Sequence, residues 1–596
     1  MPRPPRSDGK QQVYLYTCKG YRYASTQPVV IDPETGKKKL TRVLWGKVSE
    51  SLVFTPNKTY LLADEKSRSM LDFPSAWDIS VISEPAEDPK EVPVKASRGR
   101  PSYEGQDVNR LYGDVWLLEQ ICDKTGLKAD LLQVFDGDRQ QVADLLTLAF
   151  FPYLTGYTYN RVQRWQRITK APSHRSLSPE AITLFMQSIT EQHRMDLFRL
   201  RNTRLSEHDF LAVDSTSRSC HGTSLSSARW GKNKEGDKMR QTNELVVYGL
   251  KSHMPVYYRQ FPGNTPDTRT VDVLLTDLSH AGFSKVPLVM DRGYSSIASL
   301  ELLLKKAHPF VLCTKVGWSL VSTVIDALNI RKDGTRPECF ILDPQYKLYR
   351  YQQEIPYALM RNGGRTEEVT GLMLNLYYDP LRRGAEIMQV DIDRHNQELD
   401  LQAIVTEGLE VNAKEAKKSF PYYQITYNEQ QNRILAFSLD KPALAKAVRL
   451  SGFIGILSYK VEGDAKKIWD IYHLRDEQEK LFSQMKTQIA ARRTRAWSEE
   501  AHEGRLLVLF TALTFSSYLR HIWKTTDLHE KFSSSLEVLD EMRSIRCIEH
   551  TGRAKKVTPF IAKQLAICKS FDFEVPKGCK PAGNRRRKIK KPTKKK

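Results

Sequence analysis

Residues 471–489 read IYHLRDEQEKLFSQMKTQI. With about 100° of rotation per residue, this stretch predicts a helix that has an apolar face beside a polar face. The apolar face consists of Leu474, Leu481, Met485 and Ile489. The polar face spans roughly 60° and consists of Tyr472, Arg475, Glu479 and Lys486. The polar line is about 21 Å long, enough to follow several phosphates of a nucleic-acid strand. A solvated surface helix with ion pairs gives a similar pattern.

Two further acids follow stretches that predict buried strands. Residues 210–216 read FLAVDST and carry Asp214, and residues 286–291 read VPLVMD and end in Asp291. Strands and helices alternate through this region, which predicts an α/β fold whose ligands bind at strand ends. An aspartate at a strand end is also a common turn or cap residue, so the pattern alone leaves both interpretations open.

Three carboxylates on separate elements suit one kind of chemistry. Cleavage of a phosphodiester requires an activated attacking oxygen and a stabilised leaving oxygen, and paired divalent ions supply both. Asp214, Asp291 and Glu479 could hold such a pair of Mg²⁺ ions, and Mn²⁺ could replace Mg²⁺. Glu477 projects roughly 160° away from Glu479, but Asp476 lies only about 60° away and stays an alternative third acid.

The composition indicates a polyanionic partner. The 596 residues carry a formal net charge of +22, and +13 remains without the nine cations of the tail at 584–596. The eight cysteines contain no C-x-x-C spacing, which argues against a zinc ribbon or a disulfide framework and fits a reducing cytosol. The N-terminus shows no apolar signal region, and the apolar stretch 506–515 is too short to span a bilayer.

The composition along the chain predicts an α/β protein with several parts. They are a basic β-rich N-terminal module (1–86), a linker (87–101), a helical domain (102–209), the first part of the catalytic core (210–315), a β-rich insertion (316–448), the second part of the core with the Glu479 helix (449–525), and a C-terminal region with a disordered basic tail (526–596). The basic module could recognise DNA ends, or it could be a solvated charged hairpin.

Several motifs resemble one family of DNA-processing enzymes. They are LAVDSTS (211–217), GKNKEG (231–236), YYRQFPGNTPD (257–267), LVMDRGYS (288–295) and the Tyr-x2-Arg-x3-Glu-x6-Lys spacing of 472–486. They are similar to the motifs of the IS4-type DDE transposases, and the chain looks most like the IS1634 branch. The similarity runs in the family's order from roughly residue 205 to 520.

The resemblance implies a fold, an activity and roles for single residues. The core would be RNase H-like, with a mixed sheet flanked by helices, and Asp214, Asp291 and Glu479 would hold two Mg²⁺ ions. Tyr472, Arg475 and Lys486 would contact phosphates near the cleaved end. The protein would bind the terminal inverted repeats of an insertion sequence as a homodimer and move the element by cut and paste. It would act in the cytoplasm of a prokaryote, on nucleoid DNA.

Two other functions fit the same residues. A metal-dependent nuclease with this fold would cut DNA without joining it, and a retired transposase would bind DNA without cutting. The presence of all three acids argues against the second of these. Products joined to target DNA, nicks alone, or binding without cleavage separate the three functions.

Overall fold

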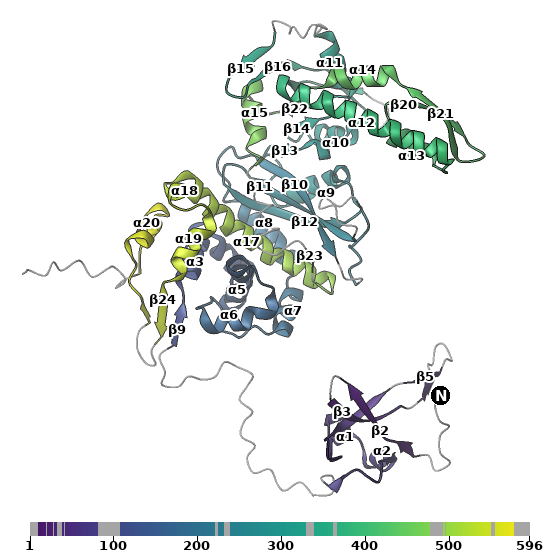
Figure 1. The fold of residues 1–596 in the computed structure, drawn as a ribbon. Coiled ribbons are helices and arrows are strands. Elements are labelled where there is room, and N and C mark those ends of the chain that lie inside the picture. The colour runs from purple at the N-terminus through teal and green to yellow at the C-terminus, as the bar shows by residue number, and fades with distance from the viewer. Residues whose placement is uncertain are drawn as a thin grey trace, which may run out of the picture. The chain divides into compact units, whose positions relative to one another are not determined.

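The computed structural model describes residues 10–18, 21–27, 29–31, 38–40, 42–80, 108–220, 224–231, 239–328, 339–360, 366–476, 493–494, 496–549 and 555–576. The chain divides into two compact units, Met1–Gly99 and Arg100–Lys596. Each unit is described by itself (Figure 1). The predicted linker at 87–101 and the basic tail at 584–596 lie outside the described residues.

The described part of the N-terminal unit is rich in short strands. Its antiparallel sheet has the order β2 (Tyr14–Cys18), β3 (Tyr21–Thr26), β6 (Val43–Val48), β7 (Phe54–Pro56). The smaller elements are β1 (Gln11–Gln12), β4 (Val29–Ile31), β5 (Lys38–Leu40), α1 (Lys58–Leu62), α2 (Glu65–Ser69) and β8 (Leu71–Asp72). Phe54 is fully buried, and its ring lies 5.5 Å from that of Tyr60. Residues 32–37, between β4 and β5, lie outside the described residues.

A large mixed sheet organises the second unit. Its first three strands form an antiparallel meander: β10 (Leu211–Cys220), β11 (Gln241–Gly249) and β12 (Met254–Pro262). Helix α9 (Asp267–His280) then leads to β13 (Leu288–Met290), and α10 (Ile297–Lys305) leads to β14 (Phe310–Thr314). Strand β13 runs parallel to β10, and β14 runs parallel to β13. The spatial order of these strands is therefore third, second, first, fourth, fifth.

The same sheet continues into the predicted insertion. Strand β22 (Phe453–Tyr459) pairs antiparallel with β14, and the sheet then adds β19 (Leu372–Tyr378), β16 (Leu348–Glu354) and β15 (Ile341–Asp343). Two hairpins lie outside this sheet. They are β17 (Tyr357–Met360) with β18 (Thr366–Val369), and β20 (Tyr423–Asn428) with β21 (Arg433–Leu439).

The insertion is more helical than the sequence prediction of a β-rich segment. Its longest described element is α12 (Pro380–Glu407), and the shorter helices are α11 (Ser319–Ala327), α13 (Ala413–Ser419) and α14 (Lys441–Leu450). Asp379 caps α12 by accepting from the backbone N–H of Leu381, Pro380 occupies the first turn, and Gly408 ends the helix at φ 62°. These are ordinary helix start and stop signals, and they outweigh the strand-forming residues nearby.

A helical layer covers one side of the sheet. Its helices are α3 (Gly113–Lys124), α4 (Leu127–Val134), α5 (Arg139–Thr155), α6 (Val162–Ile168), α7 (Pro179–Gln187) and α8 (Glu191–Asn202). The Ser178 side chain caps α7 by accepting from the N–H of Ala181, and Pro179 follows it in the first turn. The 3-10 turn Tyr159–Arg161 precedes α6.

Helix α17 (Glu499–Thr525) joins the helical layer to the sheet, and it lies between them in Figure 1. Phe510 packs against Tyr258 of β12 at 5.2 Å, whereas Phe515 packs against Phe150 of α5 at 5.1 Å. Among the described helices α17 is long and apolar enough to cross a membrane, but 72% of its most apolar window is buried in the protein. We therefore interpret α17 as the central core helix of this unit.

The C-terminal region folds back onto the helical layer. Its elements are α18 (Leu528–Lys531), α19 (Ser535–Arg543), β24 (Arg546–Glu549), β25 (Lys556–Val557) and α20 (Ala562–Ser570). Strand β24 pairs with β9 (Val108–Leu111), more than 400 residues earlier in the chain. The apolar patch at 560–568 is buried there, and the Phe560 ring meets Trp116 edge-on at 5.4 Å.

Candidate active site

The two predicted aspartates lie side by side where the parallel pairing of two neighbouring strands ends, although β10 itself continues for six residues beyond Asp214. Val213 of β10 is in register with Met290 of β13, so the next residues are Asp214 and Asp291. Asp214 is the one partly exposed residue of β10, whose other residues are buried. Three buried strand residues precede each of these partly exposed acids, so the two carboxylates lie at the same position along the sheet.

Backbone amides orient both carboxylates. Oδ1 of Asp214 accepts from the N–H of Ser215 at 2.8 Å, and Oδ1 of Asp291 accepts from the N–H of Gly293 at 2.8 Å. The second contact caps the 3-10 turn Arg292–Tyr294 that follows β13. The local fold therefore fixes where each side chain points before any metal or substrate is bound.

The structure adds a third carboxylate, Asp267, to this pair. The Ser215 hydroxyl donates to Oδ1 of Asp267 at 2.6 Å, which links it to the residue after Asp214. A Cβ at Gly293 would lie 2.9 Å from Oδ1 of Asp291 and 3.2 Å from Oδ2 of Asp267. Gly293 thus lies against both carboxylates, and a side chain at this position would collide with them. In the sequence, Asp267 stood out only as the last residue of the motif at 257–267. Its position in the first turn of α9 was the feature that could have indicated a site residue.

The buried Tyr294 reports how closely the three acids gather. Burial raises the pKa of its phenol well above the usual value, and the charges of Asp267, Asp214 and Asp291 raise it further, in that order. The phenol is fully buried and stays protonated over the physiological range. Because the charges of all three carboxylates raise the pKa of the Tyr294 hydroxyl, the three side chains lie around this one group.

Arg475 and Tyr472 reach the same site from α15 (Ala465–His473). Nη1 of Arg475 lies 4.0 Å from Oδ2 of Asp291, and its guanidinium lies 5.1 Å from the centre of the Tyr472 ring. Burial raises the pKa of the Tyr472 phenol, and its contact with the Cys313 thiol of β14 adds to the shift. The structure therefore brings Asp214, Asp291, Arg475 and Tyr472 into one neighbourhood.

The predicted helix at 471–489 is wrong at its start. Helix α15 begins at Ala465 and ends at His473, and the N–H of Arg475 bonds to the C=O of Tyr472 in a tighter turn. The buried face of the helix, with Ile468 and Ile471, ends before this turn. Leu474, expected to begin the apolar face, is 41% exposed, so packing no longer holds the chain to a straight helix.

Glu479 and Lys486 lie outside the described residues, which stop at Asp476 and resume at β23 (Arg493–Thr494). Strand β23 pairs in parallel with the end of β10, where Arg493 is in register with Ser219. The alternative third acid, Asp476, is exposed and lies next to Arg475. The described chain thus stops one residue after Arg475, which lies beside Asp291. It resumes in β23, which pairs with β10, the strand that carries Asp214.

The donor set at this edge fits a magnesium ion. Carboxylate oxygens are the ligands that Mg²⁺ prefers, and Asp214, Asp291 and Asp267 supply them without a competing histidine or cysteine ligand. Within the described ranges, no group of three His, Cys, Asp or Glu side chains is already arranged to hold a metal ion. A complete site therefore needs either a further ligand from 477–492 or a movement of Asp267.

Comparison with known proteins assigns the chain to a family. Residues 205–515 match the family described as "Transposase DDE domain", which is more than half of the chain. The chain belongs to this family of DNA transposases. No curated protein matches the chain. Among solved structures it is similar to the piggyBac transposase in a synaptic complex with hairpin DNA, with 10% identity, a TM-score of 0.32, and coverage of 71% of this chain and 70% of that chain.

Proposed function

We propose that this chain is the transposase of an insertion sequence of the IS4 type, closest to the IS1634 branch, that moves its element by cut and paste. The observation that carries the proposal is the pair Asp214 and Asp291, which directly follow the paired residues Val213 and Met290 of two neighbouring parallel strands. The family match supports a DNA-cleaving and DNA-joining enzyme. The order of β12, β11, β10, β13 and β14, with only β11 antiparallel to its neighbours, is that expected of an RNase H-like core.

The catalytic set of the proposal is Asp214, Asp291 and Glu479. Glu479 is four residues beyond Arg475, so chain length alone keeps its Cα within ~14 Å of the residue that contacts Asp291. When bound, a pair of Mg²⁺ or Mn²⁺ ions would activate the attacking oxygen and stabilise the leaving oxygen. Arg475 and Lys486 would neutralise phosphates beside the cleaved bond, and Arg475 suits a bidentate contact.

The reaction has two parts in this proposal. Water first attacks the phosphorus at the transposon end, the P–O3′ bond breaks, and a free 3′-OH remains on the element. That hydroxyl then attacks a target phosphodiester, so a new P–O3′ bond forms while one strand of the target DNA is released with its own 3′-OH. The protein would carry this out as a homodimer that pairs the two transposon ends, on nucleoid DNA in a prokaryotic cytoplasm.

The deciding experiment uses labelled duplexes that carry the inverted repeats flanking the gene, incubated with the full chain, Mg²⁺ and target plasmid. Label joined to plasmid is the expected result. Nicks without joining would identify the nuclease function instead, and bound but intact DNA would identify a retired transposase. A reaction with EDTA controls for contaminating metal-independent nucleases.

A further prediction concerns Asp267. Asp267→Asn is expected to lower cleavage about 10- to 100-fold and to raise the Mg²⁺ concentration needed for half-maximal rate, because this carboxylate holds Ser215 beside Asp214. The control is Asp272→Asn on the same helix, where the carboxylate is exposed and pairs with Lys306 at 3.0 Å. An unchanged Mg²⁺ requirement in Asp267→Asn, with the control also unchanged, would show that Asp267 only supports the fold.

A further inference from the structure

Three arginines follow one another at every third position near α6. Arg161, Arg164 and Arg167 are all exposed, and no ion pair joins any of them to a carboxylate of the described residues. The two that belong to α6 are separated by about 4.5 Å along its axis. Exposed arginines with no partner keep their full attraction for an anion, so this face is strongly cationic.

Two tyrosines of the preceding turn hold guanidinium groups in place. The guanidinium of Arg161 lies 4.5 Å above the ring of Tyr157, and that of Arg505 lies 5.3 Å above the ring of Tyr159. Stacking of this kind restricts an arginine without neutralising its charge or using its N–H donors. Less rotamer freedom is then lost when these side chains bind a ligand.

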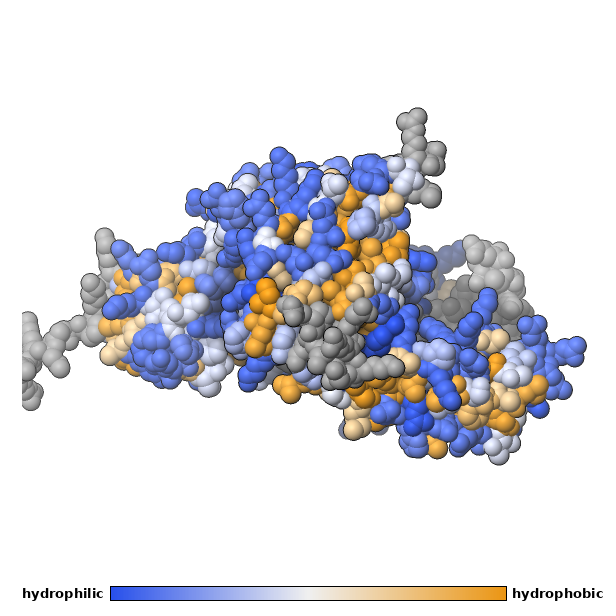
Figure 2. Space-filling view, turned by 90° about the horizontal axis from the view of Figure 1, so that it is seen from above, coloured by the Kyte–Doolittle hydropathy of each residue, from blue (hydrophilic) through white to orange (hydrophobic). Residues whose placement is uncertain are grey.

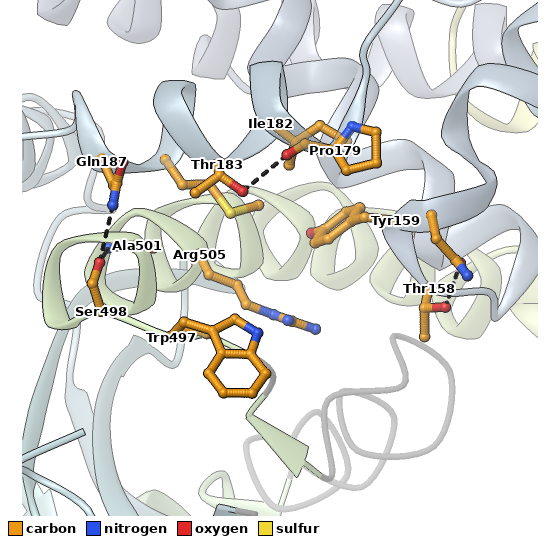
Figure 3. Close-up of a pocket in the computed structure, with 13 residues that line it drawn as sticks. Thr158, Tyr159, Pro179, Ile182, Thr183, Gln187, Trp497, Ser498, Ala501 and Arg505 are labelled. Atoms are coloured by element: carbon orange, nitrogen blue, oxygen red, sulfur yellow. Dashed lines mark hydrogen bonds between the residues drawn. The ribbon is translucent and has the colours of Figure 1, made fainter. Parts of the chain in front are cut away.

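Cavities lie on both sides of this turn. One, of about 320 Å³, is lined by Tyr157, Arg161 and Arg164 among others. The other, of about 500 Å³, is lined by Tyr159, Trp497 and Arg505 among others, and Figure 3 shows the last two near each other on one side of it. The Trp497 side chain is 80% exposed. We call Tyr157, Arg161, Arg164, Arg167, Trp497 and Arg505 the arginine surface.

Two buried acids of the helical layer are already paired with arginines. Asp114 lines the smaller cavity, but it is buried and its Oδ2 accepts from Nε of Arg543 at 2.9 Å. Asp144 is buried and pairs with Arg175 at 2.7 Å. Figure 2 shows one face of the molecule, on which hydrophilic and hydrophobic residues are mixed. Arg161, Arg164 and Arg167 therefore give the arginine surface a positive charge that no ion pair among the described residues offsets, next to the exposed rings of Tyr157 and Trp497.

The sheet connects this surface to the acidic site. Trp497 comes three residues after Thr494 of β23, which is in register with Cys220 at the end of β10. Ser219 lies five residues beyond Asp214 on the same strand, about 17 Å away at 3.3 Å per residue. That span corresponds to about five base pairs of duplex DNA.

We propose that the arginine surface binds the phosphate backbone of duplex DNA on one flank of the bond that is cleaved at Asp214 and Asp291. This inference rests on the proposed function, which makes DNA the partner, and assigns the contact to the helical layer. Arg161, Arg164, Arg167 and Arg505 contact phosphates, which makes the interaction independent of sequence and sensitive to salt. Trp497 packs against the sugar-phosphate edge or a neighbouring base.

The test measures binding of the full chain to a duplex of arbitrary sequence, without divalent metal, by fluorescence anisotropy over a range of salt concentrations. Arg161→Gln/Arg164→Gln/Arg167→Gln is expected to flatten the slope of log K against log salt by about 2 to 3 units and so to weaken binding about 100- to 1,000-fold at about 0.1 M salt. The matched control is Lys414→Gln/Lys417→Gln/Lys418→Gln on α13, which removes the same charge from exposed positions. Circular dichroism confirms that both variants are folded.

Each outcome decides the inference. A slope that becomes flatter in the arginine variant but not in the lysine variant supports the inference. An unchanged slope in the arginine variant, or equal losses in both variants, overturns it, and equal losses would show that binding depends on the overall charge of the protein. Failure of the proposed function looks different: the wild-type chain would neither cut nor join transposon ends with Mg²⁺, yet its DNA binding would still depend on these arginines. Trp497→Ala serves as a second variant, with weaker binding and an unchanged salt slope as the expected result.

Discussion

Asp214→Asn, Asp291→Asn and Glu479→Gln are each expected to lower the rate of DNA cleavage by about 1,000-fold or more, while binding to transposon ends stays within about twofold of wild type. The size follows from the several kcal/mol of transition-state stabilisation that bound metal ions provide. An amide keeps the shape of each side chain, and its oxygen still accepts from the N–H of Ser215 or Gly293. Cleavage of labelled ends and gel-shift assays on the same samples measure the two properties.

Asp476→Asn is the matched control for the third acid. Asp476 is exposed and lies only three residues before Glu479, so this variant is expected to cleave DNA at the wild-type rate. Loss of cleavage in Asp476→Asn together with normal cleavage in Glu479→Gln would transfer the role to Asp476. Parallel loss of cleavage and end binding in the Asp214 and Asp291 variants would show instead that these residues hold the fold together.

Asp130→Asn is expected to destabilise the second unit by about 3–5 kcal/mol, because it leaves a buried arginine without a counter-charge. Asp130 of α4 accepts from Nη1 of Arg201 at 2.7 Å and from Nε of Arg204 at 2.7 Å. Arg201 is fully buried, and it also donates to Sδ of Met254 on β12 at 2.9 Å. Burial lowers the pKa of Arg201 and the charge of Asp130 opposes this shift, so removing the charge weakens the link between α4, α8 and the sheet.

Thermal unfolding of the full chain measures this effect, with a decrease of roughly 3–5 °C in the midpoint expected for a unit of this size. Asp123→Asn is the control, because Asp123 is exposed and its ion pair with Lys128, at 3.3 Å, contributes under about 1 kcal/mol. A decrease of less than about 2 °C in Asp130→Asn would mean that Arg201 finds another acceptor or that water reaches it.

Local sequence signals were sufficient for much of the fold around the site. The apolar strand that carries Asp214, the cap and proline at Ser178 and Pro179, and the helix that starts at Asp267 all depend on neighbouring residues, and the structure has each of them. The adjacency of Asp214 and Asp291 followed from a general property of parallel strands, whose ends meet at one edge. These parts were predictable because short-range physics decides them.

Long-range contacts were not predictable from one sequence. Nothing in residues 108–111 indicates that they pair with residues 546–549. Strand pairing depends on which strand edges are still unpaired once the other elements of the protein have packed together. The end of α15 at His473 depends on where burial stops, and the approach of Asp267 to Asp291 depends on the placement of α9 over the sheet. Helix α12 is a different case, because its cap, proline and terminal glycine could have been read from the sequence.

The insertion is attached to the sheet in a way that bears on how such proteins diversify. Thr314 at the end of β14 lies directly opposite Gly455 of β22, so the chain leaves and rejoins at a single point. Adjacent strands are about 4.8 Å apart, a gap that a tight turn can bridge. During evolution this segment could therefore be inserted, shortened or replaced without changing the geometry of the strands that carry the two aspartates. A protein without the segment would, however, have β22 as an exposed edge strand, which promotes aggregation. This favours keeping at least β19, which pairs with β22.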